Sequence, residues 1–263
     1  MPLPYITWFT TEEARPEPEH IMLELRAKIF GRAQMDMNMQ NVPLCVGIIL
    51  DGNRRWAKER GLPLSEGHRR GLNNVEPIAL AARDLGIKHL ALYAFSTENW
   101  SRSKEEVSML TALFETMAAR KANRLIEEGA KIRFVGDLWR FSENLQKLLR
   151  EVEAKSPSDP KITIWICLSY GGRADIVQAA SVLAKRRESI TEESLQENLW
   201  TAGMPNPDII IRTGGEQRLS NFLLWQSAYS ELFFPKTFWP EFTKEELENI
   251  VHQYQTRNRR MGV

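Results

Sequence analysis

The sequence predicts a single α/β domain in which helices flank a central, mostly parallel sheet. Short apolar runs rich in β-branched residues recur along the chain, as expected for strands that are buried on both faces. Helix-compatible stretches separate these runs, which favours crossover connections between parallel strands. The alternation continues from about residue 43 to the C-terminus without an internal repeat or a low-complexity linker. We therefore expect one folded domain over residues 43–263.

The apolar runs define the expected strands, and the segments between them define the expected helices. Strands are expected over 45–50, 89–95, 131–135, 162–168 and 208–211. Helices are expected around Arg54 and Arg55, through 80–85, over 103–128, 143–154, 172–187 and 192–200, and from Thr243 onward. Because proline lacks the N–H donor of a helix, the stretch through 80–85 should begin or bend near Pro77. Ser or Thr followed three residues later by Glu, at 103–106 and 243–246, predicts a capping box at each place.

Residues 1–42 differ from the rest of the chain. Prolines at positions 2, 4, 16 and 18 interrupt the beginning, and methionines at 35, 37 and 39 lie in a stretch that contains Asn and Gln. Between them, residues 21–30 have the pattern of a short amphipathic helix. We expect an N-terminal extension that is partly helical or disordered and carries no chemistry of its own.

Composition excludes several classes of protein. Lys and Arg number 35 against 34 Asp and Glu, a net charge of +1 that gives no basis for non-specific nucleic-acid binding. No apolar run approaches the roughly 20 residues that span a bilayer, and the start lacks the pattern of a signal peptide. Cys45 and Cys167 lie in strand-like runs, as expected for buried, reduced thiols. We expect a cytoplasmic protein, and peripheral contact with a membrane stays open.

The first expected strand leads directly into a candidate anion site. Asp51, Gly52 and Asn53 end the apolar run, and Arg54 and Arg55 follow at the start of a helix. Backbone N–H groups at a helix N-terminus bind anions, and an aspartate is a natural ligand for Mg²⁺. This pattern suits a metal-bound phosphate ester. The alternative is an ordinary Asp-Gly turn followed by a solvated helix face, and no nucleotide-binding motif is present.

Three further loops also follow expected strands and carry arginine beside small or polar residues. They contain Ser96, Glu98, Asn99, Trp100 and Arg102; Tyr170, Gly171, Gly172 and Arg173; and Arg212, Thr213, Gly214, Gly215, Glu216, Arg218 and Ser220. Carboxyl ends of parallel strands meet at one edge of a sheet, so the four loops should converge. Arginine binds phosphate in a bidentate manner, and the set suggests at least two phosphate-bearing groups side by side.

Two features remain ambiguous from spacing alone. Glu231 lies in a mixed polar and apolar segment, where a salt-bridging glutamate is favoured over a second metal ligand. The expected long helix carries an apolar stripe that indicates core packing and is also compatible with the wall of a hydrophobic tunnel. The stripe consists of Met109, Leu110, Leu113, Phe114 and Met117.

Four segments resemble the signature regions of the cis-prenyltransferases. They are DGNRRWAK at 51–58, YAFSTENW at 93–100, YGGRADIV at 170–177 and IRTGGEQRLSNFLLW at 211–225. The resemblance runs in order from about residue 43 to the C-terminus. It implies an enzyme that condenses isopentenyl diphosphate with an allylic diphosphate and elongates a Z-polyprenyl diphosphate. It also implies that residues 43–263 are the catalytic domain.

The resemblance also implies roles for individual residues. Asp51 and Asn99 match the family's catalytic residues, and Asp51 and Glu231 match ligands of its Mg²⁺ ion, which overrides the interpretation of Glu231 from spacing. Substrate-binding positions of the family are matched by Gly52, Asn53, Arg54, Arg55, Trp56, His68, Ser96, Thr97, Glu98, Trp100, Arg102, Arg212, Arg218, Leu219 and Ser220. Arg260 and Gly262 match a C-terminal motif that reaches the neighbouring active site in the family's dimers, so a homodimer is expected.

Leu64 departs from the family pattern, which usually has an arginine in contact with diphosphate at this position. Loss of one charged contact costs roughly 1.5–3 kcal/mol of binding, unless Lys58, Arg60 or Arg69 compensates. An irregular or short-chain prenyl diphosphate synthase is therefore the second hypothesis. A catalytically silent partner subunit is the third, and the retained acidic and arginine residues argue against it.

Overall fold

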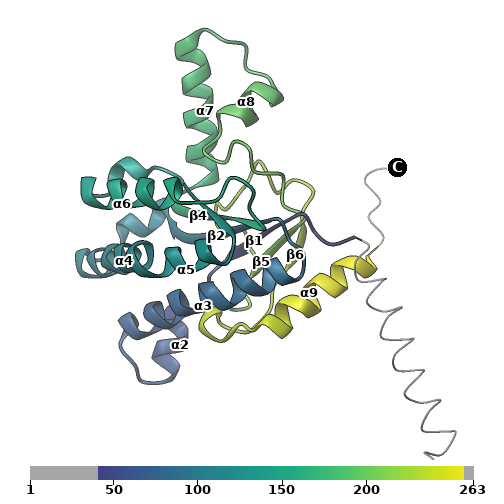
Figure 1. The fold of residues 1–263 in the computed structure, drawn as a ribbon. Helices are drawn as coiled ribbons and strands as arrows, with labels where there is room; N and C mark the ends of the chain where they lie inside the picture. The colour runs from purple at the N-terminus through teal and green to yellow at the C-terminus, as the bar shows by residue number, and fades with distance from the viewer. Residues whose placement is uncertain (1–40, 258–263) are drawn as a thin grey trace, which may run out of the picture. The chain divides into compact units, whose positions relative to one another are not determined.

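Six strands form the central sheet of the computed structural model, which describes residues 41–257 apart from the side chain of Arg120 (Figure 1). The strand order is β3-β4-β2-β1-β5-β6, and every neighbouring pair is parallel. The strands are β1 Cys45–Ile49, β2 His89–Ser96, β3 Ala130–Val135, β4 Ile162–Tyr170, β5 Ile209–Arg212 and β6 Glu231–Phe233. The predicted α/β class is confirmed, and the five predicted strands agree within two residues at each end.

Side chains alternate between the two faces of the sheet along each strand, as a period of two residues requires. In β1, Val46 and Ile48 belong to the larger apolar cluster, and Cys45 and Ile49 belong to a second cluster on the other face. All five residues of β1 are buried. Burial on both faces explains why this strand is an unbroken apolar run.

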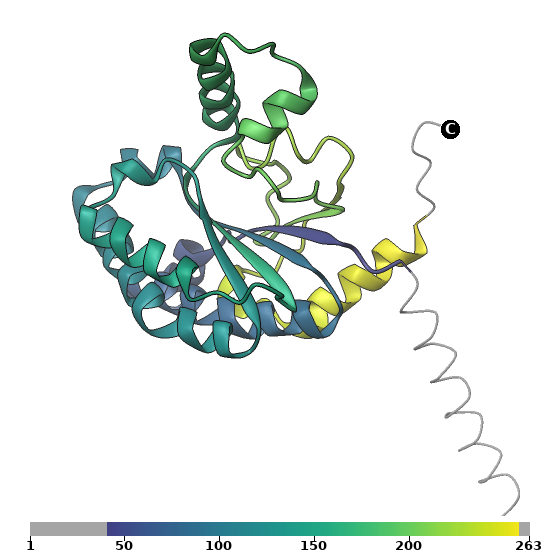
Figure 2. The same ribbon diagram turned by 45° about the horizontal axis from the view of Figure 1, so that its top comes forward.

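The helices cover the two faces unequally. Helices α3 (Leu64–Asp84), α4 (Lys104–Thr116), α5 (Ala122–Glu127), α6 (Glu143–Ala154) and α9 (Lys244–Thr256) contribute to the larger cluster on one face. The second cluster includes Met204, Phe222 and Leu223 from long connecting segments. Figure 2 shows α7 (Gly172–Arg186) and α8 (Glu192–Asn198) on this second side, projecting away from the sheet. The remaining helix, α2 (Asn53–Glu59), follows β1.

Two helix predictions need correction. The stretch through 80–85 does not begin near Pro77, because Pro77 lies inside helix α3, which starts at Leu64. The buried face of α3 includes Gly71, Val75, Ile78 and Ala82, and packing of such a face stabilises a helix more than one missing N–H donor destabilises it. The helix expected over 103–128 is divided by a π-helical turn at Met117–Lys121. Apolar periodicity continues through such a turn and does not reveal it.

Other expectations have mixed outcomes. The capping box at Thr243 forms with both of its bonds. Strand β6 was not predicted, because three residues are too few to show a period. The helix expected over 21–30 and the motif at Arg260 and Gly262 lie outside the described residues.

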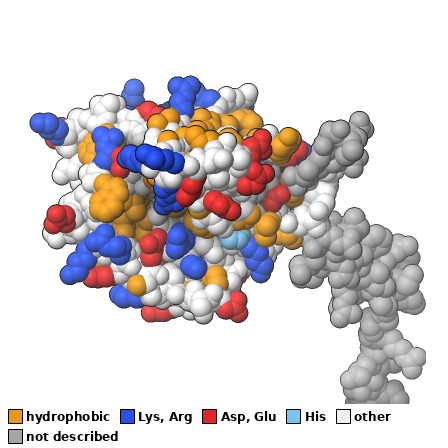
Figure 3. Space-filling model, turned by 90° about the horizontal axis from the view of Figure 1, so that it is seen from above, with side chains coloured by type: hydrophobic (Ala, Val, Ile, Leu, Met, Phe, Trp, Pro, Cys, Tyr) orange, Lys and Arg blue, Asp and Glu red, His pale blue; other side chains and the backbone are white. Residues whose placement is uncertain are grey.

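Within 41–257, no helix is long and apolar enough to cross a membrane. One face of the surface mixes basic, acidic and hydrophobic side chains (Figure 3).

Candidate active site

The candidate site lies at the carboxyl ends of β1 and β5, which are neighbours in the sheet. Ile49 of β1 is paired with Arg212 of β5, and Asp51 follows two residues later. The chain leaves β1 for β2 on one side, whereas β5 lies on the other side. Such a change of direction in strand order opens a crevice that binds ligands in open α/β sheets.

Glycine is required at position 52, between β1 and α2. Its φ angle of 108° is in the left-handed region, which a residue with a side chain rarely adopts. A Cβ atom there would also lie 2.6 Å from Cδ1 of Phe238. The Gly52 N–H donates to Oδ1 of Asp51 at 2.6 Å. The turn thus fixes the Asp51 carboxylate at the N-terminus of α2.

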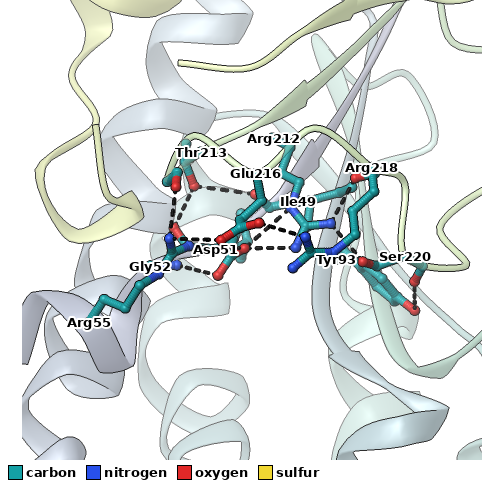
Figure 4. Close-up of polar contacts among 12 residues, drawn as sticks. Ile49, Asp51, Gly52, Arg55, Tyr93, Arg212, Thr213, Glu216, Arg218 and Ser220 are labelled. Atoms are coloured by element: carbon teal, nitrogen blue, oxygen red, sulfur yellow. Dashed lines mark hydrogen bonds and ion pairs between the residues drawn. The ribbon is translucent and has the colours of Figure 1, made fainter. Parts of the chain in front are cut away.

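Arg212 links the Asp51 carboxylate to the following loop (Figure 4). Its Nη2 and Nε atoms donate to Oδ2 of Asp51 at 2.8 and 3.2 Å. Its Nη1 atom donates to Ser220 Oγ at 2.6 Å and to the Arg218 carbonyl at 2.7 Å. Arg212 is only 5% exposed, so its charge depends on these partners. One buried guanidinium therefore positions both the aspartate and the 218–220 segment.

Arg55 and Glu216 extend this network toward solvent. Arg55 Nη2 lies 3.3 Å from Oδ2 of Asp51, and its Nη1 lies 3.2 Å from Oε1 of Glu216. The other oxygen of Glu216 accepts from Arg218 Nη1 at 2.5 Å. Acidic and basic groups therefore alternate from Arg212 to Arg218, as Figure 4 shows. The sequence places Glu216 in the loop after the last predicted strand, but only the geometry shows that it bridges two arginines.

A second charged group surrounds His68 on α3. Nε2 of His68 lies 3.4 Å from Oε1 of Glu106 without a hydrogen bond to it, and Arg102 Nη1 donates to the same oxygen at 2.9 Å. Burial lowers the pKa of His68, and the positive charge of Arg102 lowers it further, against the opposing effect of Glu106.

The Ser-x-x-Glu pattern at 103–106 forms only half of the expected capping box. The Ser103 hydroxyl accepts from the Glu106 N–H at 3.3 Å, but the Glu106 carboxylate turns toward Arg102 and His68.

The segment after β2 is held by hydrogen bonds to its own backbone and to the loop after β5. The Asn99 carboxamide accepts from the Ser96 N–H at 3.1 Å. Glu98 accepts from Nδ2 of Asn221 at 2.8 Å. Partial burial raises the pKa of Glu98, but the hydrogen bonds from Asn221 and from its own backbone N–H lower it by more. The pKa of Glu98 is therefore lowered overall. Thr97 lies close to Gly171, where a Cβ atom would meet the Thr97 hydroxyl. These contacts join three loops at one edge of the sheet.

Two polar cavities meet at Asp51. One, of about 530 Å³, is lined by Asn99, Arg212 and Ser220 among others. The other, of about 570 Å³, is lined by Arg54, Arg55, Lys58 and Leu64 among others. The residues shared by both linings are Leu50, Asp51, Asn53, His68 and Arg102. This is the arrangement expected for two anionic groups bound side by side.

A narrow apolar cavity of about 50 Å³ adjoins the polar ones. Its lining shares Leu50, Asn53 and His68 with both of them. Deeper lining residues are Leu110, Leu113, Phe114 and Met117 from the predicted apolar stripe. Met109, the fifth member of that stripe, packs against the core. Four members of the stripe thus line this cavity, and the fifth packs in the core.

The structure keeps several predicted residues away from these linings. Trp56 is buried within α2, and Arg60 lies over its ring. Trp100 donates to Ser169 Oγ at 2.8 Å, and Leu219 packs against the second apolar cluster. These three side chains anchor the segments that carry the polar residues. In contrast, Tyr93 was not assigned a role, yet it lines the polar cavity beside β5 and donates to the Tyr170 carbonyl at 3.1 Å.

Glu231 and Asp51 lie at opposite ends of the sheet. Glu231 begins β6 and is paired with Ile209, which is in turn paired with Val46 at the amino end of β1. Five residues of extended strand, about 16 Å, separate that level from Asp51. The Glu231 carboxylate accepts a hydrogen bond from Arg257. One chain therefore does not bring these two carboxylates together.

The residues at the carboxyl end of β1 suit Mg²⁺ that is shared with a phosphate. Over the described residues, no group of three His, Cys, Asp or Glu side chains could enclose a metal ion. Mg²⁺ is commonly held by one or two carboxylates together with substrate phosphates and water. Asp51 supplies one carboxylate at this edge of the sheet, whereas the buried Oδ1 atom of Asn53 lies against Gly71 of α3. A single carboxylate fits a metal that arrives with its substrate.

Comparison with known proteins identifies the family. The prenyltransferase family model, described as undecaprenyl diphosphate synthase, matches residues 49–262. An isoprenyl transferase of Ralstonia nicotianae is 46% identical over 227 residues, covering 84% of this chain and 88% of that protein. The ditrans,polycis-undecaprenyl-diphosphate synthase ((2E,6E)-farnesyl-diphosphate specific) of Micrococcus luteus is 41% identical over 234 residues, covering 86% and 94%.

A solved structure agrees with these sequence comparisons. Lavandulyl diphosphate synthase from Lavandula x intermedia, in complex with dimethylallyl diphosphate, matches with a TM-score of 0.81 and 35% identity. The match covers 84% of this chain and 99% of that one. The sheet topology, the loops at its carboxyl edge and these similarities lead to one conclusion. The chain belongs to the cis-prenyltransferase family, whose named members are prenyl diphosphate synthases.

Proposed function

We propose that this chain condenses isopentenyl diphosphate with an allylic diphosphate primer to make a Z-polyprenyl diphosphate, in a reaction that depends on Mg²⁺. The observation that carries the proposal is the pair of polar cavities that meet at Asp51, of which one alone is lined by Arg54 and Arg55 and the other alone by Arg212. A condensation of two diphosphates needs two anion sites next to each other. A protein that binds one phosphate-bearing ligand needs only one anion site, and a purely structural protein needs none.

The allylic diphosphate is assigned to the cavity on the α2 side. Arg54, Arg55 and Lys58 line it, and the N-terminus of α2 adds backbone N–H groups. Ionisation of the primer places charge on the departing diphosphate, and preorganised cations stabilise that charge. Mg²⁺, held by Asp51 and diphosphate oxygens, would neutralise further charge on the leaving group. Asp51 therefore acts where the bond to the allylic carbon breaks.

Isopentenyl diphosphate is assigned to the cavity beside β5. Arg212 and Ser220 line it, and Arg218 lies in the same loop. Asn99 lines this cavity from the β2 side. After the new carbon–carbon bond forms, one proton must leave the isopentenyl unit. We assign Asn99 to orienting that unit toward the group that accepts the proton, such as a diphosphate oxygen.

The apolar cavity provides a path for the growing chain. It adjoins the reacting groups at Leu50 and Ala94 and continues along α4. An apolar wall excludes water from the allylic cation and accepts successive five-carbon units. A long apolar product would also bring the protein into peripheral contact with a membrane.

A second candidate function is supported by Leu64. Its side chain is 39% exposed and lines the proposed allylic cavity, where the family usually has an arginine. Lys58 lines the same cavity and supplies a positive charge. If Lys58 does not replace the missing contact, short or branched products from five-carbon units become the alternative. The similarity to a lavandulyl diphosphate synthase is consistent with this alternative.

The assembly is also part of the proposal. We propose that residues 43–263 form the catalytic domain, after an N-terminal extension of 1–42, and that the domain works as a homodimer. Asp51 and Glu231 are far apart along the sheet of one chain, so Glu231 would reach a metal only at the site of another copy. A mixture of D51N and E231Q subunits would then regain part of the activity that each variant lacks alone.

Product analysis tests the function. Purified protein is incubated with labelled isopentenyl diphosphate, with dimethylallyl, geranyl, farnesyl or geranylgeranyl diphosphate, and with Mg²⁺ or EDTA. Long Z-chains that require both a primer and Mg²⁺ are expected, and D51N should abolish them. Short or branched products would favour the second candidate. No turnover with any primer would contradict both and favour a catalytically silent subunit.

A further inference from the structure

Glu216 contacts arginines that belong to both proposed diphosphate sites. Its Oε1 atom lies 3.2 Å from Arg55 Nη1, on the allylic side. Its Oε2 atom lies 2.5 Å from Arg218 Nη1, on the isopentenyl side. Figure 4 shows the Glu216 carboxylate between these two arginines. A single carboxylate thus occupies hydrogen-bond donors that two substrates would use.

The pairs made by Glu216 are exchangeable, unlike the neighbouring pair of Arg212 and Asp51. The side chains of Glu216, Arg55 and Arg218 are 36%, 39% and 59% exposed, whereas that of Arg212 is 6% exposed. Exposed ion pairs contribute little net free energy, because water and salt compete with them. Diphosphate oxygens carry more charge and bind guanidinium groups in bidentate fashion, so they can replace a carboxylate here.

Local structure keeps Glu216 in this position when no anion competes. Glu216 follows Gly214 and Gly215, whose φ angles are 83° and 76°. A Cβ atom on Gly214 would lie 2.6 Å from Arg55 Nη2, so the glycine leaves room for this guanidinium beside the loop. Arg55 Nη1 also donates to the Gly214 carbonyl at 3.0 Å. The loop therefore holds Arg55 next to the Glu216 carboxylate.

We propose that Glu216 is an internal counter-ion that holds Arg55 and Arg218 together and is displaced when the two diphosphates bind. The inference rests on the proposed function, because it assigns those arginines to diphosphates. Glu216 then limits the affinity for both substrates. It also prevents repulsion between the arginines in the free protein and keeps them oriented toward the site. Glu216 is a positioning residue, and none of its atoms takes part in bond making or breaking.

Equilibrium binding tests this role. Isopentenyl diphosphate and dimethylallyl diphosphate are titrated separately into wild type and E216Q by calorimetry, in EDTA and in Mg²⁺. Glutamine keeps the shape but removes the charge, so E216Q should bind both ligands about threefold to tenfold more tightly in both media. In an R218A background, the gain for isopentenyl diphosphate should largely disappear. E128Q removes an ion pair with Arg83 on another part of the chain and should leave both affinities unchanged.

The other outcomes separate this inference from the proposed function. Normal binding by wild type with equal or weaker binding by E216Q in EDTA would overturn the counter-ion role alone. Weaker binding by E216Q only in Mg²⁺ would also overturn it, because it would make Glu216 a metal ligand. No binding of either diphosphate to wild type would overturn the proposed function as well. Circular dichroism of each variant confirms that it is folded.

Discussion

Arg212 is the single residue on which most of the site geometry depends. It donates to both Asp51 and Ser220 and to the Arg218 carbonyl from a buried position. Its planar guanidinium holds its donors in a fixed fork, with two nitrogens on Asp51 and the third on Ser220, and a compact ammonium group does not reproduce this geometry. Sequence alone indicated an anion-binding arginine at this position. It did not indicate that the same guanidinium is bonded to the proposed metal ligand.

Replacement of Arg212 by lysine tests this role. R212K keeps the charge but loses the forked contacts, which should cost roughly 1.5–3 kcal/mol of transition-state stabilisation. We expect kcat/KM to fall by about tenfold to over a hundredfold. R83K is the control, because Arg83 pairs with Asp84 and Glu128 at the surface. Equal kinetics for R212K and wild type would contradict the positioning role of the guanidinium.

The loop after β5 depends on an unusual backbone conformation. Ser220, Asn221 and Leu223 all have positive φ angles, and that of Asn221 is 66°. The Asn221 side chain accepts from the Arg173 N–H at 2.9 Å and donates to Glu98 at 2.8 Å. Asparagine tolerates the left-handed region better than most residues. It therefore joins the loops after β2, β4 and β5 at moderate cost in backbone energy.

A pair of substitutions separates the two contributions of Asn221. N221G and N221A both lose the side-chain bonds, which should lower the free energy of unfolding by about 1–2 kcal/mol. Alanine should lose about 1 kcal/mol more, because it also disfavours the positive φ angle. Urea unfolding of both variants measures the difference. If N221G and N221A are equally stable, the left-handed conformation at this position is not what the loop requires.

A buried acid ties α7 to the segments that follow it. Asp175 is fully buried and accepts from Tyr170 Oη at 3.0 Å and from the Trp200 N–H at 2.6 Å. Gln226 Nε2 lies 3.4 Å from the same carboxylate. Burial raises the pKa of Asp175 to about 6, and the hydrogen bonds from Trp200, Tyr170 and Gln226 oppose this effect. The neutral acid is therefore favoured in the folded protein relative to the unfolded chain.

This shift predicts how stability depends on pH. The neutral Asp175 side chain makes its full contribution to the free energy of unfolding below about pH 3.9, the pKa of aspartate in the unfolded chain. This contribution is lost as the pH rises through about 6, the pKa of Asp175 in the folded protein. A shift of this size corresponds to roughly 3 kcal/mol of the free energy of unfolding. D175N cannot ionise, so its stability should change less than that of wild type between pH 4 and pH 7. Parallel pH profiles for the two proteins in urea unfolding would contradict the assignment.

The accuracy of the sequence predictions depended on how local each signal is. The apolar run at 45–50 and the turn after it predicted β1 and α2 well, because burial and turn chemistry are encoded by adjacent residues. Long-range effects were missed. The path of α3 through Pro77 depends on packing against the sheet, and the carboxylate of Glu106 is used by His68 and Arg102 rather than by its own helix cap. Glu231 could not be placed until the register of β6 was known.

At the scale of the whole molecule, the apolar cavity connects the reacting groups to the core. Leu72, Val75, Met117 and Ile166 line both the cavity of about 50 Å³ and a smaller one of about 10 Å³ beyond it. Met117 begins the π-helical turn between α4 and α5. These shared residues separate the two spaces. Their size should therefore limit how far a product chain extends into the protein.

Product length tests this view of the cavity. Ala94 lines both the apolar cavity and the polar one above it, so A94L should block the path near its start and shorten the product by one or more five-carbon units. M117A should join the two apolar spaces and lengthen the product, at some cost in stability from the lost packing. M109A is the matched control, because Met109 lies on α4, which leads into the turn that begins at Met117, and packs outside both linings. Chromatography of labelled products measures all three variants under the same conditions. A94L narrows this cavity and M117A enlarges it. If A94L, M117A and wild type nevertheless give the same product distribution, the growing chain follows another path.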